Sequence, residues 1–225
     1  MRGLSGKVAG SGAALAVAFV AGHAEAQSAY NWTGFYVGLH GDYGWGSTHA
    51  EQAGTSKSNG IAAGLQAGYN WQFSSFLVGV EVDGTLSGIS SKADPFFDGK
   101  NATLKSKQRW SATARLKAGM PLSDVPVVGN MLLYGTGGLA YSRWKTELQE
   151  NAIGGNLQQS DAQNQFGWVL GAGVEVPLWD NVSARVEYLR THYFRKNYDL
   201  VTDSSGKLGI DHDLNSVRLG INFRF

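Results

Sequence analysis

The chain contains no cysteine, and only four of its 225 residues are proline. The lack of cysteine excludes a disulfide framework, a lipoprotein anchor and any metal site built from thiolates. Beyond residue 26 there is also no segment long and apolar enough to form a membrane-spanning helix, which needs roughly 20 apolar residues. We therefore expect a fold without covalent cross-links and without helical membrane spans.

The first 26 residues have the three parts of a secretory signal peptide. Arg2 and Lys7 form a short basic region, and an apolar run of small residues extends from Val8 to Val20. Ala24-Glu25-Ala26 then matches an A-x-A cleavage site. We expect residues 1–26 to be removed and residues 27–225 to form the exported domain.

The exported domain also lacks an excess of either charge. Removing residues 1–26 takes two of the 19 basic and one of the 18 acidic residues, which leaves 17 of each. A neutral domain has no electrostatic attraction for nucleic acid, so we expect no nucleic-acid partner.

Glycine and aromatic residues are abundant, with 31 glycines and 12% aromatic residues. They fall within segments in which apolar and polar residues alternate, as is typical of strands in a curved sheet. This pattern predicts eight strands: Phe35–Trp45, Ile61–Phe73, Phe76–Leu86, Trp110–Met120, Leu132–Trp144, Phe166–Val176, Val182–Thr191 and Asn215–Phe225.

The last of these segments is the most regular. Val217, Leu219, Ile221, Phe223 and Phe225 share one parity, and residues of the other parity are polar, cationic or glycine. Successive side chains of a strand point to opposite faces, so the segment has one apolar and one polar face. In a membrane barrel the apolar face contacts lipid and the polar face lines the lumen.

The connections between the predicted strands alternate in length. The long ones, residues 46–60, 87–109, 145–165 and 192–214, are polar, whereas residues 74–75, 121–131 and 177–181 form short ones. Outer-membrane barrels have long external loops and short periplasmic turns. We therefore predict an all-β, eight-stranded, antiparallel, up-and-down transmembrane barrel in the outer membrane of a Gram-negative bacterium, with both termini in the periplasm.

Tryptophan supports the same topology, because its positions coincide with the two ends of the predicted strands. Aromatic residues form girdles at both rims of membrane barrels. The predicted girdle residues are Trp32, Trp45, Trp71, Trp110, Trp144, Trp168, Trp179, Phe223 and Phe225. The seventh strand departs from its alternation at Arg190 and His192, where we expect a bulge or the membrane edge.

Several runs resemble the small, porin-like outer-membrane β-barrel family of alphaproteobacteria, which includes Brucella surface antigens and Bartonella haemin-binding proteins. They include Trp32-Thr33-Gly34-Phe35-Tyr36-Val37-Gly38, Gly68-Tyr69-Asn70-Trp71-Gln72, Gly79-Val80-Glu81-Val82-Asp83, and the run from Leu133 to Tyr141. The resemblance implies insertion by the barrel-assembly machinery, and for some members haemin binding or a role as host-facing antigens. It carries no catalytic residues.

The inward parity predicts a network of charged side chains in the lumen. Its members are His40, Asp42, Glu81, Asp83, Arg115, Lys117, Glu175, Arg185, Glu187, Arg218 and Arg224. Eight strands leave an interior that side chains can fill, whereas porins with an aqueous channel use about 16–18 strands. We expect paired charges to plug the lumen; the alternative is a low-conductance path for small solutes.

Other candidate chemistry is sparse. His192 and His212 flank the last external connection and could approach each other, which makes them the candidate haemin ligands. Two histidines make no complete metal-ligand set, and no nucleophile, base and acid converge, so we expect no metal site, no cofactor and no catalysis. The sequence therefore predicts a structural, surface-exposed barrel in contact with outer-membrane lipids and lipopolysaccharide; the alternatives are a low-conductance porin and a haemin or ligand receptor.

Overall fold

The computed structural model describes residues 30–50, 54–93, 96–97, 100–126, 128–152, 155–199 and 207–225. The predicted signal peptide lies outside these residues, so its removal stays a prediction. Within them, no helix is long and apolar enough to cross a membrane.

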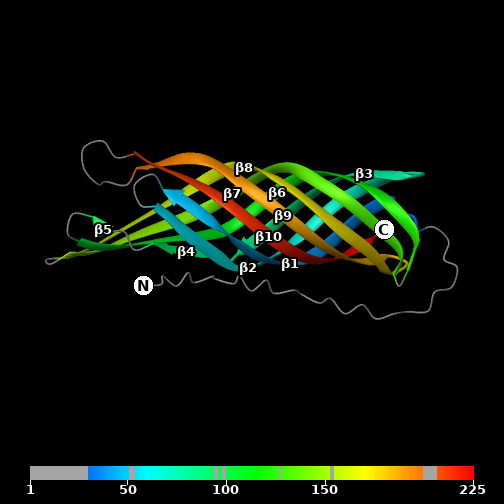
Figure 1. Cartoon of the computed structure of the whole chain (residues 1–225), viewed down its shortest axis with the longest axis horizontal. Helices are drawn as coiled ribbons and strands as arrows, with labels where there is room; N and C mark the ends of the chain where they lie inside the picture. The colour runs from blue at the N-terminus through cyan, green and yellow to red at the C-terminus, as the bar shows by residue number, and fades with distance from the viewer. Residues whose placement is uncertain are drawn as a thin grey trace, which may run out of the picture.

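The described residues form one closed antiparallel sheet (Figure 1). The eight long strands are β1 (Gly34–Ala50), β2 (Gly54–Phe73), β3 (Phe76–Ser87), β6 (Lys100–Val125), β7 (Gly129–Ala152), β8 (Gly155–Trp179), β9 (Val182–Asp199) and β10 (Lys207–Arg224). Each pairs with its neighbours along the chain, and β1 pairs with both β2 and β10. The predicted eight-stranded up-and-down barrel is therefore confirmed.

Two short strands lie between β3 and β6. Strand β4 (Ser90–Ala93) pairs with β2 and β6, so it continues the course of β3 beyond the break at residues 88–89. Strand β5 (Phe96–Phe97) pairs only with β6 among the described residues. Neither adds a member to the closed wall.

The long polar connections expected from the sequence are mostly strand, which corrects that expectation. Residues 46–50 and 54–60 belong to β1 and β2, and β7 and β8 remain paired as far as Ala152 and Gly155. The sequence of these extensions is predominantly polar at positions of both parities, so it lacks the alternation by which a half-buried strand is recognised. Figure 1 shows them as long hairpins at the end of the barrel opposite the C-terminus.

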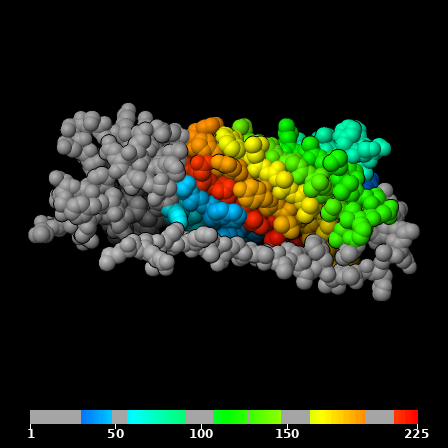
Figure 2. All heavy atoms as spheres, viewed as in Figure 1, coloured from blue at the N-terminus to red at the C-terminus, as the bar shows by residue number. Residues whose placement is uncertain are grey.

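The two ends of the barrel differ accordingly. One carries the short turns after β2, β6 and β8 together with the C-terminal residue Phe225, and we call it the turn end. The other carries the extended hairpins, and we call it the hairpin end. Figure 2 shows tilted strands β1, β10, β9 and β8 following one another across the side of the barrel.

Burial alternates along the strands, most regularly in β3, where exposed and buried residues follow one another from Phe76 to Leu86. The exposed parity carries large apolar side chains such as Leu39, Leu65 and Ile221. The buried parity carries mostly polar and charged ones. In the glycine-rich β7, whose parity the sequence left ambiguous, Leu132, Tyr134 and Thr136 point inward.

Strand β9 pairs with β10 without a break from Val182 to Tyr193, so Arg190 and His192 themselves are not bulged. The register shift follows directly: β9 has one extra residue between Tyr193 and Lys196, opposite Ile210 and His212 of β10. Arg190 and His192 therefore keep the outward parity of Tyr188. A bulge therefore does occur in β9, but just beyond His192 and not at Arg190 or His192, and the edge of the apolar band stays a prediction.

Neighbouring strands approach so closely at some glycines of β7 that a larger residue there would collide with backbone atoms. At Gly138 an added Cβ would collide with the backbone carbonyl of Ala114 on β6. At Gly135, on the same strand, the nearest atom to an added Cβ is the Gly171 carbonyl oxygen at 3.8 Å, an ordinary contact.

We predict that Gly138→Ala lowers the free energy of unfolding by about 1–3 kcal/mol, because backbone must move to admit the methyl group. Gly135→Ala is the matched control and should fold like the wild type. Urea titrations in lipid vesicles, read by heat-modifiable gel migration, measure both variants. Equal midpoints for Gly138→Ala and the wild type would contradict the close approach of β7 to β6.

Candidate functional site: the charged lumen

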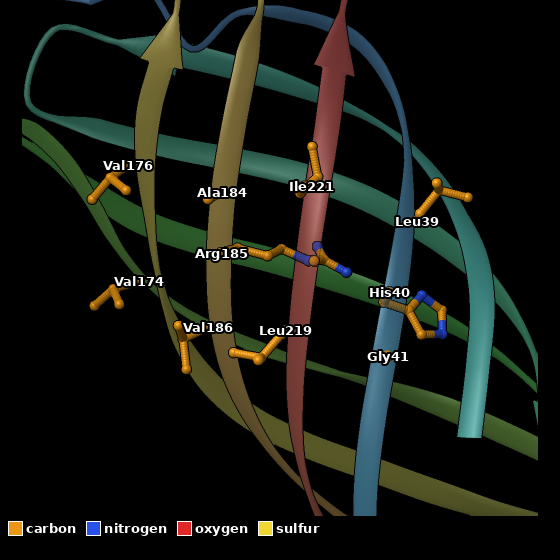
Figure 3. A pocket seen from close by; sticks show the side chains of 11 residues that line it. Leu39, His40, Gly41, Val174, Val176, Ala184, Arg185, Val186, Leu219 and Ile221 are labelled. Atoms are coloured by element: carbon orange, nitrogen blue, oxygen red, sulfur yellow. The ribbon is translucent and has the colours of Figure 1, made fainter. Parts of the chain in front are cut away.

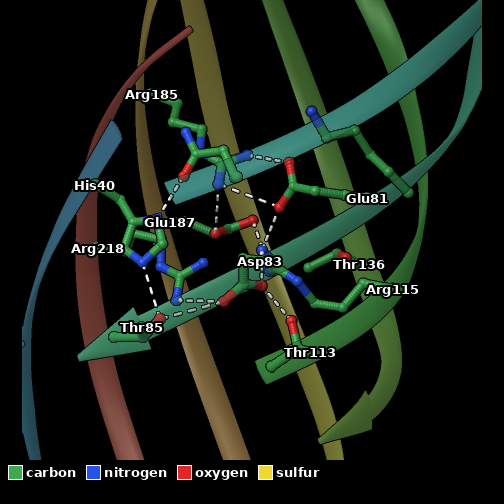
Figure 4. A network of polar contacts seen from close by, with 12 residues as sticks. His40, Glu81, Asp83, Thr85, Thr113, Arg115, Thr136, Arg185, Glu187 and Arg218 are labelled. Carbon is green, nitrogen blue, oxygen red and sulfur yellow. Dashed lines mark hydrogen bonds and ion pairs between the residues drawn. The ribbon is translucent and has the colours of Figure 1, made fainter. Parts of the chain in front are cut away.

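Charged side chains from six strands meet inside the barrel (Figure 4). Ten of the eleven predicted lumen residues are buried: His40, Asp42, Glu81, Asp83, Arg115, Lys117, Glu175, Arg185, Glu187 and Arg218. They comprise five carboxylates, four Arg or Lys side chains and one histidine. We call these ten residues the lumen network.

Glu81 of β3 is the centre of the network. Its carboxylate accepts hydrogen bonds from Arg115 of β6 and from Arg185 of β9, whose Nη2 lies 3.1 Å from Glu81 Oε1. Tyr36 is the third donor residue, and its hydroxyl donates to Oε2 at 2.6 Å. Strands β3 and β9 are four places apart in a ring of eight, so the Glu81–Arg185 pair spans the lumen between opposite walls.

Arg218 organises the half of the network nearer the hairpin end. Its Nε and Nη2 donate to the two carboxylate oxygens of Asp42 at 2.8 and 3.1 Å, a bidentate arrangement. Nη2 also lies 3.3 Å from Asp83 Oδ1. Asp83 in turn accepts a hydrogen bond from Thr113 and lies 3.4 Å from Arg115 Nη2.

Glu175 organises the half nearer the turn end. Lys117 Nζ donates to its Oε2 at 3.1 Å, and Ser183 and Asn222 donate to Oε1 at 2.5 and 2.9 Å. The Lys117 ammonium also lies 4.2 Å from the centre of the Tyr134 ring, within cation–π range. Every carboxylate oxygen of Glu175 therefore has a donor.

Neutral polar residues link the network to the two remaining strands. His40 Nδ1 lies 2.5 Å from Gln66 Oε1 of β2, and Gln66 donates to Asn222 at 2.7 Å. The Tyr134 hydroxyl of β7 donates to Glu187 at 3.2 Å. The network predicted from the sequence contained only charged residues and histidine. The neutral residues Gln66, Asn222 and Tyr134 share the same inward parity but were not predicted.

Arg224 does not join the network, contrary to the sequence expectation. Its guanidinium lies at the turn end, 4.3 Å from the centre of the Tyr30 ring and 5.6 Å from that of Trp32. Its Nη2 lies 3.4 Å from the Asp180 carbonyl oxygen. Burial raises the pKa of the Tyr30 phenol, and the neighbouring Arg224 opposes that rise. Arg224 sits one residue from the chain end, beyond the reach of the central carboxylates.

Two clusters of apolar and aromatic side chains lie in the lumen beyond the network. At the turn end, Trp32, Leu77, Leu132 and Tyr134 pack together. Towards the hairpin end the cluster contains Ala140, Trp144, Val169, Leu189 and Tyr193. Trp144 also stacks on His212, with ring centres 4.1 Å apart and planes 3° apart.

These clusters correct two of the girdle assignments. Trp32 and Trp144 are each only 1% exposed and point into the lumen. Trp32 precedes β1 and turns inward, and Trp144 has the inward parity of β7. Of the other predicted girdle residues, Trp45, Trp71, Trp179, Phe223 and Phe225 are exposed on the outer face, and Trp110 and Trp168 are half-buried there.

The outer face carries aromatic contacts near both ends. At the turn end Phe73 stacks on Phe76 with ring centres 5.0 Å apart, and Phe223 contacts Phe225 edge-on at 5.1 Å. Towards the hairpin end, Tyr141 contacts both Trp110 and Phe166.

The candidate haemin ligands His192 and His212 do not form a pair. Their strands are neighbours, but His212 lies in the lumen whereas His192 points outward, where Nδ1 is 3.1 Å from Asp213 Oδ1. Because they occupy opposite faces of the wall, they cannot bind one iron together. Among the residues whose side chains are described, no group of three or more His, Cys, Asp or Glu could hold a metal ion.

The buried charges should make the barrel sensitive to the loss of one partner. We predict that Glu81→Gln lowers the free energy of unfolding by about 3–5 kcal/mol, because it leaves Arg115 and Arg185 in the lumen without their shared carboxylate. Urea unfolding in phospholipid vesicles gives the value.

Asp124→Asn, which removes an exposed carboxylate at the turn end of β6, is the control and should unfold like the wild type. A Glu81→Gln barrel as stable as this control would show that the ion pairs contribute little.

Comparison with known proteins places this barrel among outer-membrane proteins. Residues 13–225 match the family described as outer membrane protein beta-barrel domain. The 25 kDa outer-membrane immunogenic protein of Brucella canis is 34% identical over 197 residues, which cover 87% of this chain and 80% of that protein. The 22 kDa outer membrane protein of Rhizobium leguminosarum is 31% identical over 202 residues, covering 90% and 82%.

The fold is similar to that of solved barrels. The outer membrane protein OprG from Pseudomonas aeruginosa aligns over 88% of this chain and 99% of its own, with a TM-score of 0.47 and 13% sequence identity.

Proposed function

This chain belongs to the outer membrane protein beta-barrel domain family. Within that family, we propose that it is a non-conducting barrel with a structural, surface-exposed role. In this proposal the barrel contributes to the integrity of the envelope and presents its hairpins outside the cell. It performs no catalysis and needs no cofactor.

The observation that carries the proposal is the filling of the lumen. The Glu81–Arg185 pair joins opposite walls, and Arg218 fills the space between Asp42 and Asp83. Apolar clusters lie on both sides of this charged layer. An ion entering the barrel would have to displace paired charges and packed aromatic rings, which supports a closed lumen over the alternative of a low-conductance porin.

We predict that purified wild-type protein shows no steady channels in planar lipid bilayers. The reason is that three successive layers of side chains occupy the narrow interior of an eight-stranded barrel. A 16-stranded porin inserted under the same conditions is the positive control. Reproducible conductance steps from the folded protein would overturn the closed lumen.

The proposed orientation places the turn end in the periplasm and the hairpins outside. Short turns lie at the periplasmic side of bacterial outer-membrane barrels and longer connections at the external side. Tyr30 and Phe225 both lie at the turn end, so both ends of the exported chain would be periplasmic. The barrel-assembly machinery would insert it from that side.

The lack of cysteine makes this orientation testable with single labels. We predict that Gln52→Cys, between β1 and β2, reacts with a membrane-impermeant maleimide on intact cells. Ser75→Cys, in the exposed turn between β2 and β3, should react only after the outer membrane is opened. The reverse pattern would invert the proposed topology.

Surface exposure also suggests the partners. The Brucella relative is named an immunogenic protein, which supports an antigenic role for the hairpins of this chain. Arg109, Arg143 and Arg190 are exposed towards the hairpin end, where guanidinium groups could pair with lipopolysaccharide phosphates. A haemin or ligand receptor is the weaker alternative, since His192 and His212 lie on opposite faces.

A further inference from the structure

Two exposed arginines face each other on the outer side of the barrel, towards the hairpin end. The register of β6 against β7 shifts between Gln108 and Trp110, so Arg109 is the extra residue of a β-bulge. In such a bulge two residues of one strand face one residue of its neighbour, and here Arg109 and Trp110 face Arg143 of β7. The bulge therefore places a guanidinium and an indole side by side on one face of β6. We call Arg109 and Arg143 the arginine pair.

The arginine pair is a concentration of positive charge. Like charges directly across neighbouring strands destabilise a sheet, yet neither guanidinium has an ion-pair partner among the described residues. Lys107, which precedes the inward-pointing Gln108, is exposed as a third cation. The described carboxylates of β3, β6 and β8 point into the lumen, except that of Asp124 at the turn end. The patch therefore favours an anion that comes from outside the protein.

An aromatic layer adjoins the arginine pair on the side of the turn end. Tyr141 lies two residues before Arg143 on β7. Its ring contacts Trp110, with centres 5.5 Å apart, and Phe166 of β8, with centres 4.7 Å apart. Aromatic side chains mark the membrane–water interface of barrels, with hydrocarbon on one side and head groups on the other. The arginine pair thus lies at the level of the head groups, next to the hydrocarbon.

The apolar band below this level does not distinguish one lipid from another. A hollow of about 420 Å³ lies over β8, β9, β10 and β1, and its outward side chains, such as Leu39, Val174 and Ile221, are aliphatic (Figure 3). Its polar lining residues, His40 and Arg185, belong to the lumen network. Such a surface contacts any hydrocarbon chain. Selection of one kind of lipid therefore requires charged groups at the edge of the band, as at the arginine pair.

We propose that the arginine pair and the aromatic layer bind one lipid A unit of lipopolysaccharide, with a phosphate between the two guanidinium groups. Each guanidinium can donate two parallel hydrogen bonds to a phosphate, and an acyl chain would lie against Trp110, Tyr141 and Phe166. The site deepens the proposed lipopolysaccharide contact by assigning it to β6 and β7. Its place in the outer leaflet rests on the proposed orientation.

Titration of the purified, folded full chain with bisphosphorylated lipid A in detergent, followed by native mass spectrometry, tests the site. Arg143→Gln and Arg109→Gln should each weaken binding by roughly tenfold or more, as expected for the loss of charge-assisted hydrogen bonds. Arg190→Gln is the matched control, because Arg190 is also exposed but lies on β9, diagonal to the carboxylate of Asp213. It should bind like the wild type. Heat-modifiable gel migration verifies that each variant is folded.

Three further ligands identify the group that is bound. Dephosphorylated lipid A should bind the wild type more weakly than the bisphosphorylated form, and the combined variant Arg109→Gln/Arg143→Gln should remove that difference. Phosphatidylglycerol, a phospholipid with one phosphate, should not displace bound lipid A at equal concentration. A heparin oligosaccharide, which carries anionic groups without acyl chains, should not displace it either.

Equal affinity of the wild type, Arg109→Gln and Arg143→Gln for lipid A would overturn the site, and so would an equal loss in Arg190→Gln. Displacement by phosphatidylglycerol or by the heparin oligosaccharide would overturn the assignment to lipid A. These measurements use purified protein and do not depend on conductance or on cysteine labelling. The site, the closed lumen and the proposed orientation can therefore fail separately.

Discussion

Closure of the sheet between β1 and β10 is the constraint on which the rest of the structure depends. The two strands pair without a register shift from Tyr36 and Arg224 to Ala50 and Ile210. Closure gives every strand two partners, so backbone groups are satisfied within the wall, as a lipid environment requires. It also leaves each side chain only two destinations, the lipid face or the lumen. The alternation of residue types along the chain follows from that choice.

Because the barrel has a small circumference, charged side chains that point into its lumen lie close to one another. Inward charges on eight strands lie too close together to remain hydrated, and a buried charge without a partner is costly. The carboxylate of Glu81 is neutralised by two arginines from different strands. The carboxylate of Glu175 accepts hydrogen bonds from Lys117, Ser183 and Asn222. The pairs that neutralise the charges also tie opposite walls together. The ion pairs across the lumen are therefore a consequence of making a polar interior stable.

Much of this could be predicted from the sequence because a strand has a period of two. The pattern from Val217 to Phe225 was sufficient to assign its lipid and lumen faces. The same parity rule brought together Glu81, Arg115 and Arg185, which are far apart in sequence. It needed no knowledge of register, since all inward charges of a narrow barrel come within reach of one another. Arg224 escaped the rule because a residue at the strand end can turn its side chain along the rim.

The type of a residue predicted which face of the wall it occupies less well than its parity along the strand did. Tryptophan at a strand end suggested a lipid-facing girdle, yet Trp144 follows Tyr134 and Ser142 on the inward parity of β7. Glycines hid that parity, because they carry no side chain to show which face they occupy. Trp32 lies before the first strand, where no alternation applies. The extended hairpins were missed for a related reason, since a predominantly polar segment shows no period of two in its sequence.

The two tryptophans that were predicted in the girdle but lie in the lumen have a physical role that the sequence could not reveal. Trp32 and Trp144 belong to apolar clusters on either side of the lumen network. By excluding water from both directions, such clusters lower the effective dielectric constant around the charges and strengthen the ion pairs. The same exclusion makes a missing partner more costly. The charged layer and its apolar neighbours are therefore interdependent, and together they occupy successive levels of the barrel interior.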